Sequence, residues 1–190
     1  MQLTKLTQDL FDHLYRDISE FRTTFNLPVA QPDTLNDQQD SLHSSLIIEE
    51  LTELAEAPDK TEQADAIVDS IYVLMGRLVH LGQSNIHDNI AISYFIDVLL
   101  NVAANRQINF VACWNEVHSS NMSKVCRTQQ EYAETQTYYA KQGIELMPVT
   151  KGDYIIAKCA KDFTSPEKSI KQGKVLKSIY YRPADLASIA

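Results

Sequence analysis

Two groups of acidic residues are the part of this sequence best suited to chemistry. The first acidic group is Glu49, Glu50 and Glu53, and the second acidic group is Glu62, Asp65 and Asp69. Leucine, isoleucine and valine residues surround both groups, so the segment is not a solvated acidic tail. Carboxylates crowded beside apolar helix faces repel one another and lose hydration. A bound cation resolves both problems, so the pattern predicts a metal site.

Helical spacing places the members of each group on one face. Residues three and four positions apart lie on the same side of an α-helix, and Glu56 extends the face of the first group. Only eight residues separate Glu53 from Glu62, and Pro58 within that stretch ends the preceding helix. Because a short connection favours antiparallel packing of the two helices, the two acidic faces can meet.

The ligands of such a site are all hard oxygen atoms. They suit Mg²⁺, with Mn²⁺ as an alternative, and offer nothing selective for zinc or copper. Magnesium usually retains waters and also binds substrate phosphates. The arrangement therefore predicts phosphoryl or pyrophosphoryl chemistry, in which the metal neutralises charge on the phosphate and a carboxylate takes a proton from the attacking water.

Apolar periodicity predicts a mainly helical chain that carries these acids. Helices are expected over residues 3–25, 41–56, 61–81, 85–105 and 109–120, and residues 129–142 can also be helical. Thr61 is the expected cap of the third helix and Gly82 its stop. Tyr154, Ile155 and Ile156 are expected to form a short strand, followed by a lysine-rich loop at residues 165–178. The fold class is therefore all-α, a helical bundle with a short β or irregular C-terminal tail. Residues 1–190 are expected to be one domain, with a core of about 1–127 and an extension of about 128–190.

Composition excludes several classes of function. The 190 residues carry a net charge of −8, and no basic stripe exists that could neutralise a nucleic-acid polymer. The three cysteines form no CxxC pair, which indicates buried or free thiols in a reducing compartment. The N-terminus does not resemble a signal peptide, and no apolar run approaches a membrane span. A cytoplasmic location is expected.

The acidic groups also resemble a known signature. EELTE (49–53) and EQADAIVDSIYVLMG (62–76) look like the EExxE, gap, ExxD pattern of the all-α nucleoside triphosphate pyrophosphohydrolases, which include MazG-like proteins, dimeric dUTPases and phosphoribosyl-ATP pyrophosphohydrolases. FNLPVAQP (25–32), EVHSSNMSK (116–124) and GKVLKSIYYRPADL (173–186) resemble parts of a MazG-like subgroup in the same order. The resemblance touches most of the chain. One departure is the gap before Glu62, which is shorter than the family pattern.

The resemblance implies an activity and roles for residues. The expected activity is Mg²⁺-dependent hydrolysis of a nucleoside triphosphate between the α- and β-phosphates, giving the monophosphate and pyrophosphate. Glu50 is expected to assist the attacking water. The expected metal ligands are Glu49, Glu53, Glu62, Asp65 and Asp69. The expected substrate contacts are Asn121, Lys124, Lys174, Lys177 and Arg182. A homodimer, or a dimer of dimers, is also implied, and the preferred base is left open.

Two alternatives remain at this point. An HD-type metal phosphohydrolase would use His87 and Asp88 as its dyad, with His43, His80 and Asp97 as further ligands. A non-enzymatic helical interaction protein would leave the acids solvated. Apolar residues on both sides of the third helix argue against the second alternative, because they indicate burial within a bundle.

Overall fold

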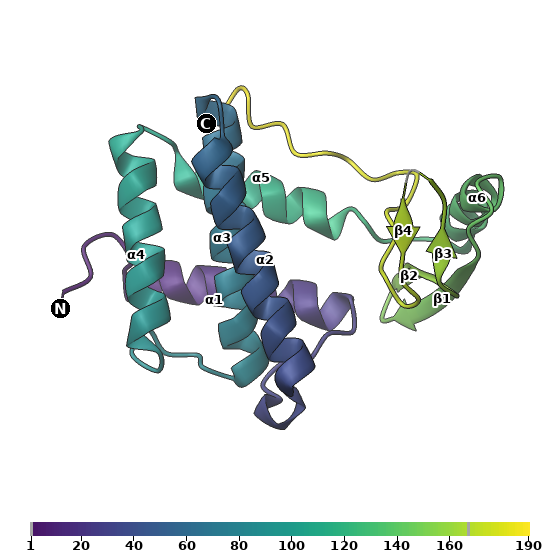
Figure 1. Cartoon of the computed structure of the whole chain (residues 1–190), viewed down its shortest axis with the longest axis horizontal. Helices are drawn as coiled ribbons and strands as arrows, with labels where there is room; N and C mark the ends of the chain where they lie inside the picture. The colour runs from purple at the N-terminus through teal and green to yellow at the C-terminus, as the bar shows by residue number, and fades with distance from the viewer. Residues whose placement is uncertain (1, 167) are drawn as a thin grey trace. The chain divides into compact units, whose positions relative to one another are not determined.

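The structure is a computed structural model that describes residues 2–166 and 168–190 (Figure 1). It divides into two compact units. The first comprises residues up to Thr23, Leu27–His118 and Asp185–Ala190, and the second comprises Thr24–Asn26 and Ser119–Ala184. The expected single domain, with an extension from about residue 128, stays a prediction.

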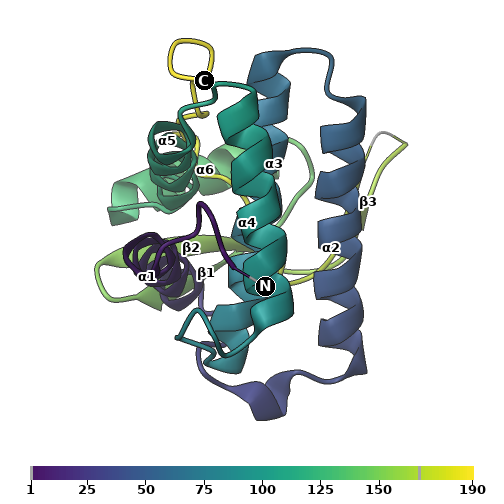
Figure 2. The same ribbon diagram turned by 90° about the vertical axis from the view of Figure 1, so that its left-hand side faces the viewer.

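The first unit is built from helices. They are α1 (Gln8–Thr24), the 3₁₀ turn η1 (Pro32–Thr34), α2 (Asp37–Glu56), α3 (Lys60–Leu81), α4 (Ile90–Asn105) and α5 (Phe110–Met122). The last residue of α1 and the last turn of α5, from Ser119, belong to the second unit. Helix α3 packs against both α2 and α4, and α1 and α5 cross these three helices at steep angles (Figures 1 and 2). The predicted helical character of this region is confirmed.

Helix α3 is the centre of the first unit. Most of its residues from Ala64 to His80 are buried, on all sides of the helix. The predicted cap at Thr61 is wrong, because the side chain of Asp59 accepts the backbone N–H of Glu62 at 3.0 Å and starts the helix earlier. The predicted stop at Gly82 is confirmed. Its φ is +72°, and a Cβ there would lie 3.1 Å from the Cβ of Ala30, so the position requires glycine.

Helix α2 is covered far less completely. It begins at Asp37, four residues before the predicted start, because the side chain of Asn36 accepts the N–H of Gln39. Among its described residues His43 alone is buried. Leu42 and Ile48 are 49% and 64% exposed. The side of α2 away from α3 therefore presents apolar side chains to the surroundings of this chain.

Two other helices begin later than predicted, because local hydrogen bonds replace helical ones. Helix α1 begins at Gln8 rather than residue 3, since the N–H groups of residues 4–6 bond to the Asp97 carboxylate. Helix α4 begins at Ile90 rather than residue 85, since the Asn89 side chain caps it. In the first segment the apolar pattern begins at Leu3, so it extends beyond the start of the helix.

The second unit combines one helix with short strands. They are α6 (Gln129–Ala140), β1 (Leu146–Lys151), β2 (Tyr154–Cys159), β3 (Phe163–Thr164) and β4 (Ser169–Ile170). Strands β1 and β2 form an antiparallel hairpin, and β3 pairs with β4 in the same sense. The predicted strand at 154–156 is confirmed and is longer than predicted. The loop predicted at 165–178 contains β4, which sequence reasoning missed.

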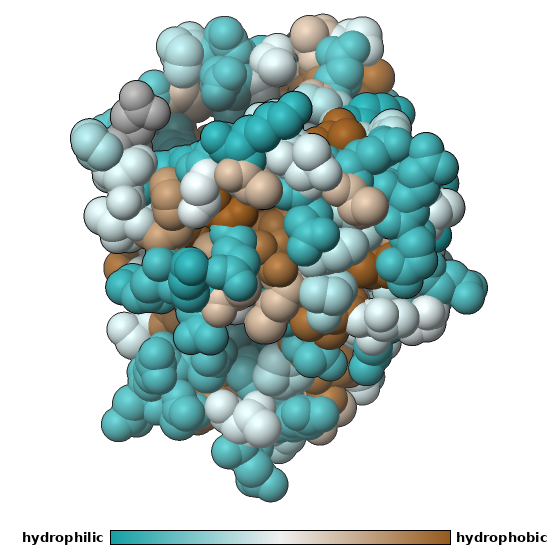
Figure 3. Space-filling view, turned by 90° about the vertical axis from the view of Figure 1, so that its right-hand side faces the viewer, coloured by the Kyte–Doolittle hydropathy of each residue, from teal (hydrophilic) through white to brown (hydrophobic). Residues whose placement is uncertain are grey.

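The surface is mixed in polarity (Figure 3), and the three cysteines lie in the interior. Hydrophilic side chains predominate on the face in Figure 3, with hydrophobic ones showing between them. Cys113, Cys126 and Cys159 are free and buried, as predicted. None of the described helices combines the length and the hydrophobicity that a membrane crossing requires.

Candidate functional site

The two acidic groups meet across the antiparallel hairpin of α2 and α3 (Figure 2). The pKa of Glu50 is raised to about 7, first by burial and then by the neighbouring charges of Asp69, Glu53, Glu49 and Asp65, in that order. Asp69 has the largest effect of these charges, although it belongs to the other helix. The prediction that helical phase would bring the two faces together is therefore confirmed for Glu50.

A second contact between the groups lies one turn along the hairpin. Burial raises the pKa of Asp65, and the charges of Glu62 and Glu53 add to the effect. Glu62 stands in the first turn of α3, which Asp59 caps. The short connection before Glu62 thus does not remove it from the neighbourhood of the other acids.

The cluster gathers six carboxylates from two neighbouring helices. Glu50, Asp65 and Asp69 are half-buried, whereas Glu49, Glu53 and Glu62 are exposed. Within the described part of the chain, no ion pair to a basic residue involves any of the five acids Glu49, Glu50, Glu53, Glu62 and Asp65. Crowded carboxylates of this kind raise one another's pKa, and a cation reverses that effect.

The donor set fits a hard divalent cation, although its side chains have not converged. Among residues 2–166 and 168–190, no group of three or more His, Cys, Asp or Glu side chains is arranged to hold a metal ion. The three exposed glutamates can change rotamer without disturbing the core. The chemistry of the donors, all carboxylate oxygens, suits Mg²⁺ or Mn²⁺.

The expected substrate contacts lie in the second unit, and three of them gather around the end of α5. Lys124 Nζ donates to Asn121 Oδ1 at 2.6 Å. Arg182 donates from Nη2 to Ser119 Oγ at 2.7 Å, and its backbone N–H donates to Ser123 Oγ at 3.0 Å. Arg182 also lines a cavity of about 280 Å³ together with Arg127 and Glu131. Asn121, Lys124 and Arg182 thus form a polar cluster near the end of α5, and two of the three side chains are cationic.

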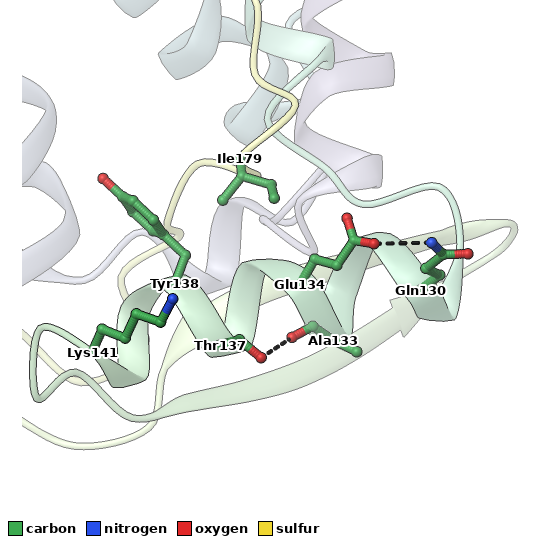
Figure 4. Close-up of a pocket in the computed structure, with 7 residues that line it drawn as sticks. All are labelled: Gln130, Ala133, Glu134, Thr137, Tyr138, Lys141 and Ile179. Carbon is green, nitrogen blue, oxygen red and sulfur yellow. Dashed lines mark hydrogen bonds between the residues drawn. The ribbon is translucent and has the colours of Figure 1, made fainter.

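The two remaining expected contacts are exposed lysines. Lys177 Nζ lies 4.3 Å from the ring centroid of Tyr181, a cation–π contact. Lys174 is exposed on the segment after β4. A hollow of about 410 Å³ runs along α6 opposite Ile179, and its lining contains a single carboxylate, Glu134 (Figure 4). It has no cluster of acids and does not support metal chemistry.

The residues required for an HD-type site are engaged elsewhere. Asp88 accepts the backbone N–H of Asn85 at 2.9 Å, and Asp97 accepts the N–H groups of residues 4–6. His43 and His80 form a hydrogen bond with each other. These contacts give the HD alternative no support.

Sequence reasoning missed Arg22, which lies in the interior of the first unit. The side chain of Arg22 is 8% exposed, and its Nε donates to the carbonyl oxygen of Pro28 at 2.7 Å. Burial lowers the pKa of Arg22 to about 10, which leaves the group charged at neutral pH. A signal was present in the sequence, because Arg22 follows Ile18 by four positions and so falls on the apolar stripe of α1.

A comparison of the sequence with family models agrees with this geometry. Residues 18–89 match the model of the family phosphoribosyl-ATP pyrophosphohydrolase, and this segment contains all six acids of the cluster. No match was found among curated proteins or among solved structures. Enzymes of this family typically depend on a divalent metal. Residues 18–89 are therefore similar to a phosphoribosyl-ATP pyrophosphohydrolase domain, a member of the MazG-like superfamily of nucleotide pyrophosphohydrolases, which are hydrolases of phosphoric anhydride bonds.

Proposed function

We propose that this protein hydrolyses nucleoside triphosphates between the α- and β-phosphates, releasing a nucleoside monophosphate and pyrophosphate. One observation carries the proposal. Within the segment that matches the pyrophosphohydrolase family, Glu50 is surrounded by four further carboxylates contributed by two helices. A nucleotide-pool enzyme located in the cytoplasm fits this activity and the acidic charge of the chain.

The acids divide into one group that moves a proton and others that bind metal. Glu50 accepts a proton from the attacking water, because it is the half-buried member of the first group. The metal ligands are Glu49, Glu53, Glu62, Asp65 and Asp69. A bound Mg²⁺ or Mn²⁺ supplies charge neutralisation at the phosphates and lowers the pKa of water.

The second unit carries cationic groups whose chemistry suits phosphate oxygens. Lys124 and Arg182 are suited to this role, since guanidinium and ammonium groups bind phosphate oxygens with charge-assisted hydrogen bonds. Asn121 orients Lys124 through their 2.6 Å contact. Lys174 and Lys177 add positive charge on an exposed segment of the same unit.

The protein acts as a homodimer, or as a dimer of dimers. The observation that supports this is the incomplete cover of α2, where Leu42 and Ile48 are largely exposed. Apolar residues on one helix face favour burial against another protein surface. Because the same helix carries the first acidic group, a partner copy seated there would also shield the site from water.

The assay that tests the activity separates products by the bond that is broken. The protein is incubated with each common ribo- and deoxyribonucleoside triphosphate in the presence of Mg²⁺, and the products are resolved by anion-exchange chromatography. Equal amounts of monophosphate and pyrophosphate are expected from at least one nucleotide. Release of orthophosphate with a diphosphate would contradict cleavage between the α- and β-phosphates.

Metal binding is tested without activity, through thermal stability. Addition of Mg²⁺ or Mn²⁺ is expected to raise Tm of the native protein, because an ion that binds only the folded state stabilises it. At 100 times Kd the gain is about 2.7 kcal/mol. Replacing Glu53 by Gln is expected to remove most of that rise. A control variant, Asp33→Asn, changes an exposed acid outside the cluster and should keep it. An equal rise in both variants would show that Glu53 is not a ligand.

A further inference from the structure

A cavity of about 160 Å³ lies in the first unit, next to the acidic cluster. Leu46 and Val73 line it from α2 and α3. Leu46 precedes Glu50 by four residues, and Val73 follows Asp69 by four. One helical turn, about 5.4 Å, therefore separates the cavity wall from the acids on both helices. A molecule whose phosphate lies at the acids can reach into the cavity with its other end.

The lining is mostly apolar, with an aromatic pair as one wall. The rings of Phe21 and Tyr72 meet edge to face, with centroids 5.4 Å apart. Ile18, Leu46 and Val73 add aliphatic surface. Such a lining favours an uncharged, flat group over a free phosphate, because an anion would lose its hydration without gaining enough donors.

Arg22 is the hydrogen-bond donor of the cavity. Its Nε donates to the carbonyl oxygen of Pro28. Its two terminal nitrogens make no hydrogen bond or ion pair with any residue that the structure describes. Nη1 lies 3.7 Å from the place that a Cβ would occupy at Gly76, another residue of the lining. The absence of a side chain at Gly76 thus leaves space in front of the guanidinium.

His43 is the hydrogen-bond acceptor, and a chain of hydrogen bonds fixes its tautomer. The Thr34 hydroxyl donates to the carbonyl oxygen of Gln31 at 2.7 Å, so its oxygen accepts Nε2–H of His80 at 2.8 Å. The Nδ1 atom of neutral His80 is then an acceptor, and Nε2–H of His43 donates to it at 3.2 Å. His43 is therefore protonated on Nε2, and its Nδ1 keeps a free lone pair.

We infer that this cavity binds the pyrimidine ring of the nucleotide, with Arg22 donating to a ring carbonyl and His43 Nδ1 accepting an N–H of the base. A carbonyl beside an N–H occurs on the edge of uracil and thymine, and cytosine offers a carbonyl and an amino group. Size decides against purines, because an apolar cavity of about 150 Å³ accommodates a single six-membered ring. The inference rests on the proposed function and assigns it a substrate class, the pyrimidine nucleoside triphosphates.

The first test compares specificity constants. For the native protein, kcat/KM with dUTP, dCTP or dTTP is expected to exceed that with dATP and dGTP by at least tenfold. In Arg22→Met the ratio should fall toward one, mainly through a higher KM for the pyrimidine nucleotide. Arg16→Met is the matched control, since Arg16 lies on the same helix but is 72% exposed, and it should leave the ratio unchanged. Equal rates for both classes in the native protein would overturn the inference.

A second variant guards against loss of folding in Arg22→Met. Gly76→Ala places a methyl group in the cavity within van der Waals distance of Arg22, and alanine favours the helix. We expect Tm to be unchanged or higher and the preference for pyrimidines to fall several-fold. An unchanged preference in Gly76→Ala, with normal folding by circular dichroism, would contradict binding of the base at this place.

The third test needs no hydrolysis and separates the two proposals. Trp114 is the only tryptophan, and its ring centroid lies 5.2 Å from that of Tyr72 in the cavity wall. Deoxyuridine or deoxycytidine, added without metal, should change its fluorescence saturably, and Arg22→Met should abolish the change. This response without any turnover would retain the cavity assignment and refute the hydrolysis. Turnover without the response, or a response to deoxyadenosine or inorganic phosphate instead, would retain the hydrolysis and refute the assignment.

Discussion

Replacing Glu50 by Gln is expected to lower kcat for nucleotide hydrolysis about 10³-fold, since removal of a positioned general base typically costs 10²- to 10⁴-fold. Gln has nearly the same shape as Glu but cannot accept a proton at neutral pH. The half-buried position of Glu50 between the two acidic faces means that no exposed acid can take its place without moving. Steady-state kinetics with the preferred nucleotide and saturating Mg²⁺ measures the effect.

The same substitution should stabilise the fold when metal is absent. The pKa of Glu50 is raised to about 7, well above its value in an unfolded chain. The folded state therefore binds the proton more tightly, and its stability falls as the pH rises from about 4.5 to 7. Gln carries no charge at any pH, so the Glu50→Gln variant does not lose stability in this way. With EDTA present at pH 8, Glu50→Gln is expected to gain about 1 kcal/mol in free energy of unfolding, and the gain should disappear at pH 4.

The opposite directions of these two effects make the result specific to a functional acid. A variant that merely damaged the fold would lose both activity and stability. Asp33→Asn, which removes an exposed carboxylate of the same unit, should change neither by much. Retention of more than a tenth of native kcat in Glu50→Gln would show that another residue activates the water.

The acidic cluster was predictable because its geometry is local. Spacings of three and four residues fix a helix face, and a short connection between two helices leaves antiparallel packing as the simple solution. The charges of Asp69 and Asp65 act on Glu50 and that of Glu53 on Asp65, which matches that prediction. Convergence onto a metal ion depends on side-chain rotamers, which no spacing in the sequence determines.

The cavity was not predictable because it depends on contacts between distant residues. Arg22, His43 and Gly76 come from three different helices, and the tautomer of His43 is fixed by Thr34 through His80. The helix starts at Gln8 and Ile90 differ from the predictions for the same reason. In each case a side-chain acceptor, Asp97 or Asn89, satisfies backbone N–H groups that the periodic pattern had assigned to the helix.

Replacing Asp97 by Ala is expected to cost about 3 kcal/mol of folding free energy, because it leaves several backbone donors without a partner. The Asp97 carboxylate is 3% exposed. It accepts the N–H groups of Lys5 at 2.6 Å and Leu6 at 2.7 Å, and both the N–H and the hydroxyl of Thr4 at 3.0 Å. This carboxylate thus anchors the segment that precedes α1 to α4. Urea unfolding at pH 7, followed by circular dichroism, measures the loss.

The pH dependence of that loss identifies the carboxylate as its cause. Burial alone would raise the pKa of Asp97, but the hydrogen bonds from Leu6, Lys5 and Thr4 together lower it below the usual value. The stabilisation by the Asp97 carboxylate is therefore complete above about pH 4, which is the pKa of an Asp carboxyl group in an unfolded chain. It is lost as the pH falls further, through the pKa of Asp97 in the folded state. The difference in free energy of unfolding between the native protein and Asp97→Ala should therefore become smaller over that pH range. Asp88→Ala, which removes an exposed carboxylate that accepts one backbone N–H, should cost about 1 kcal/mol or less. A loss as small in Asp97→Ala would mean that the segment before α1 is held by its apolar contacts, with Leu6 as the buried anchor.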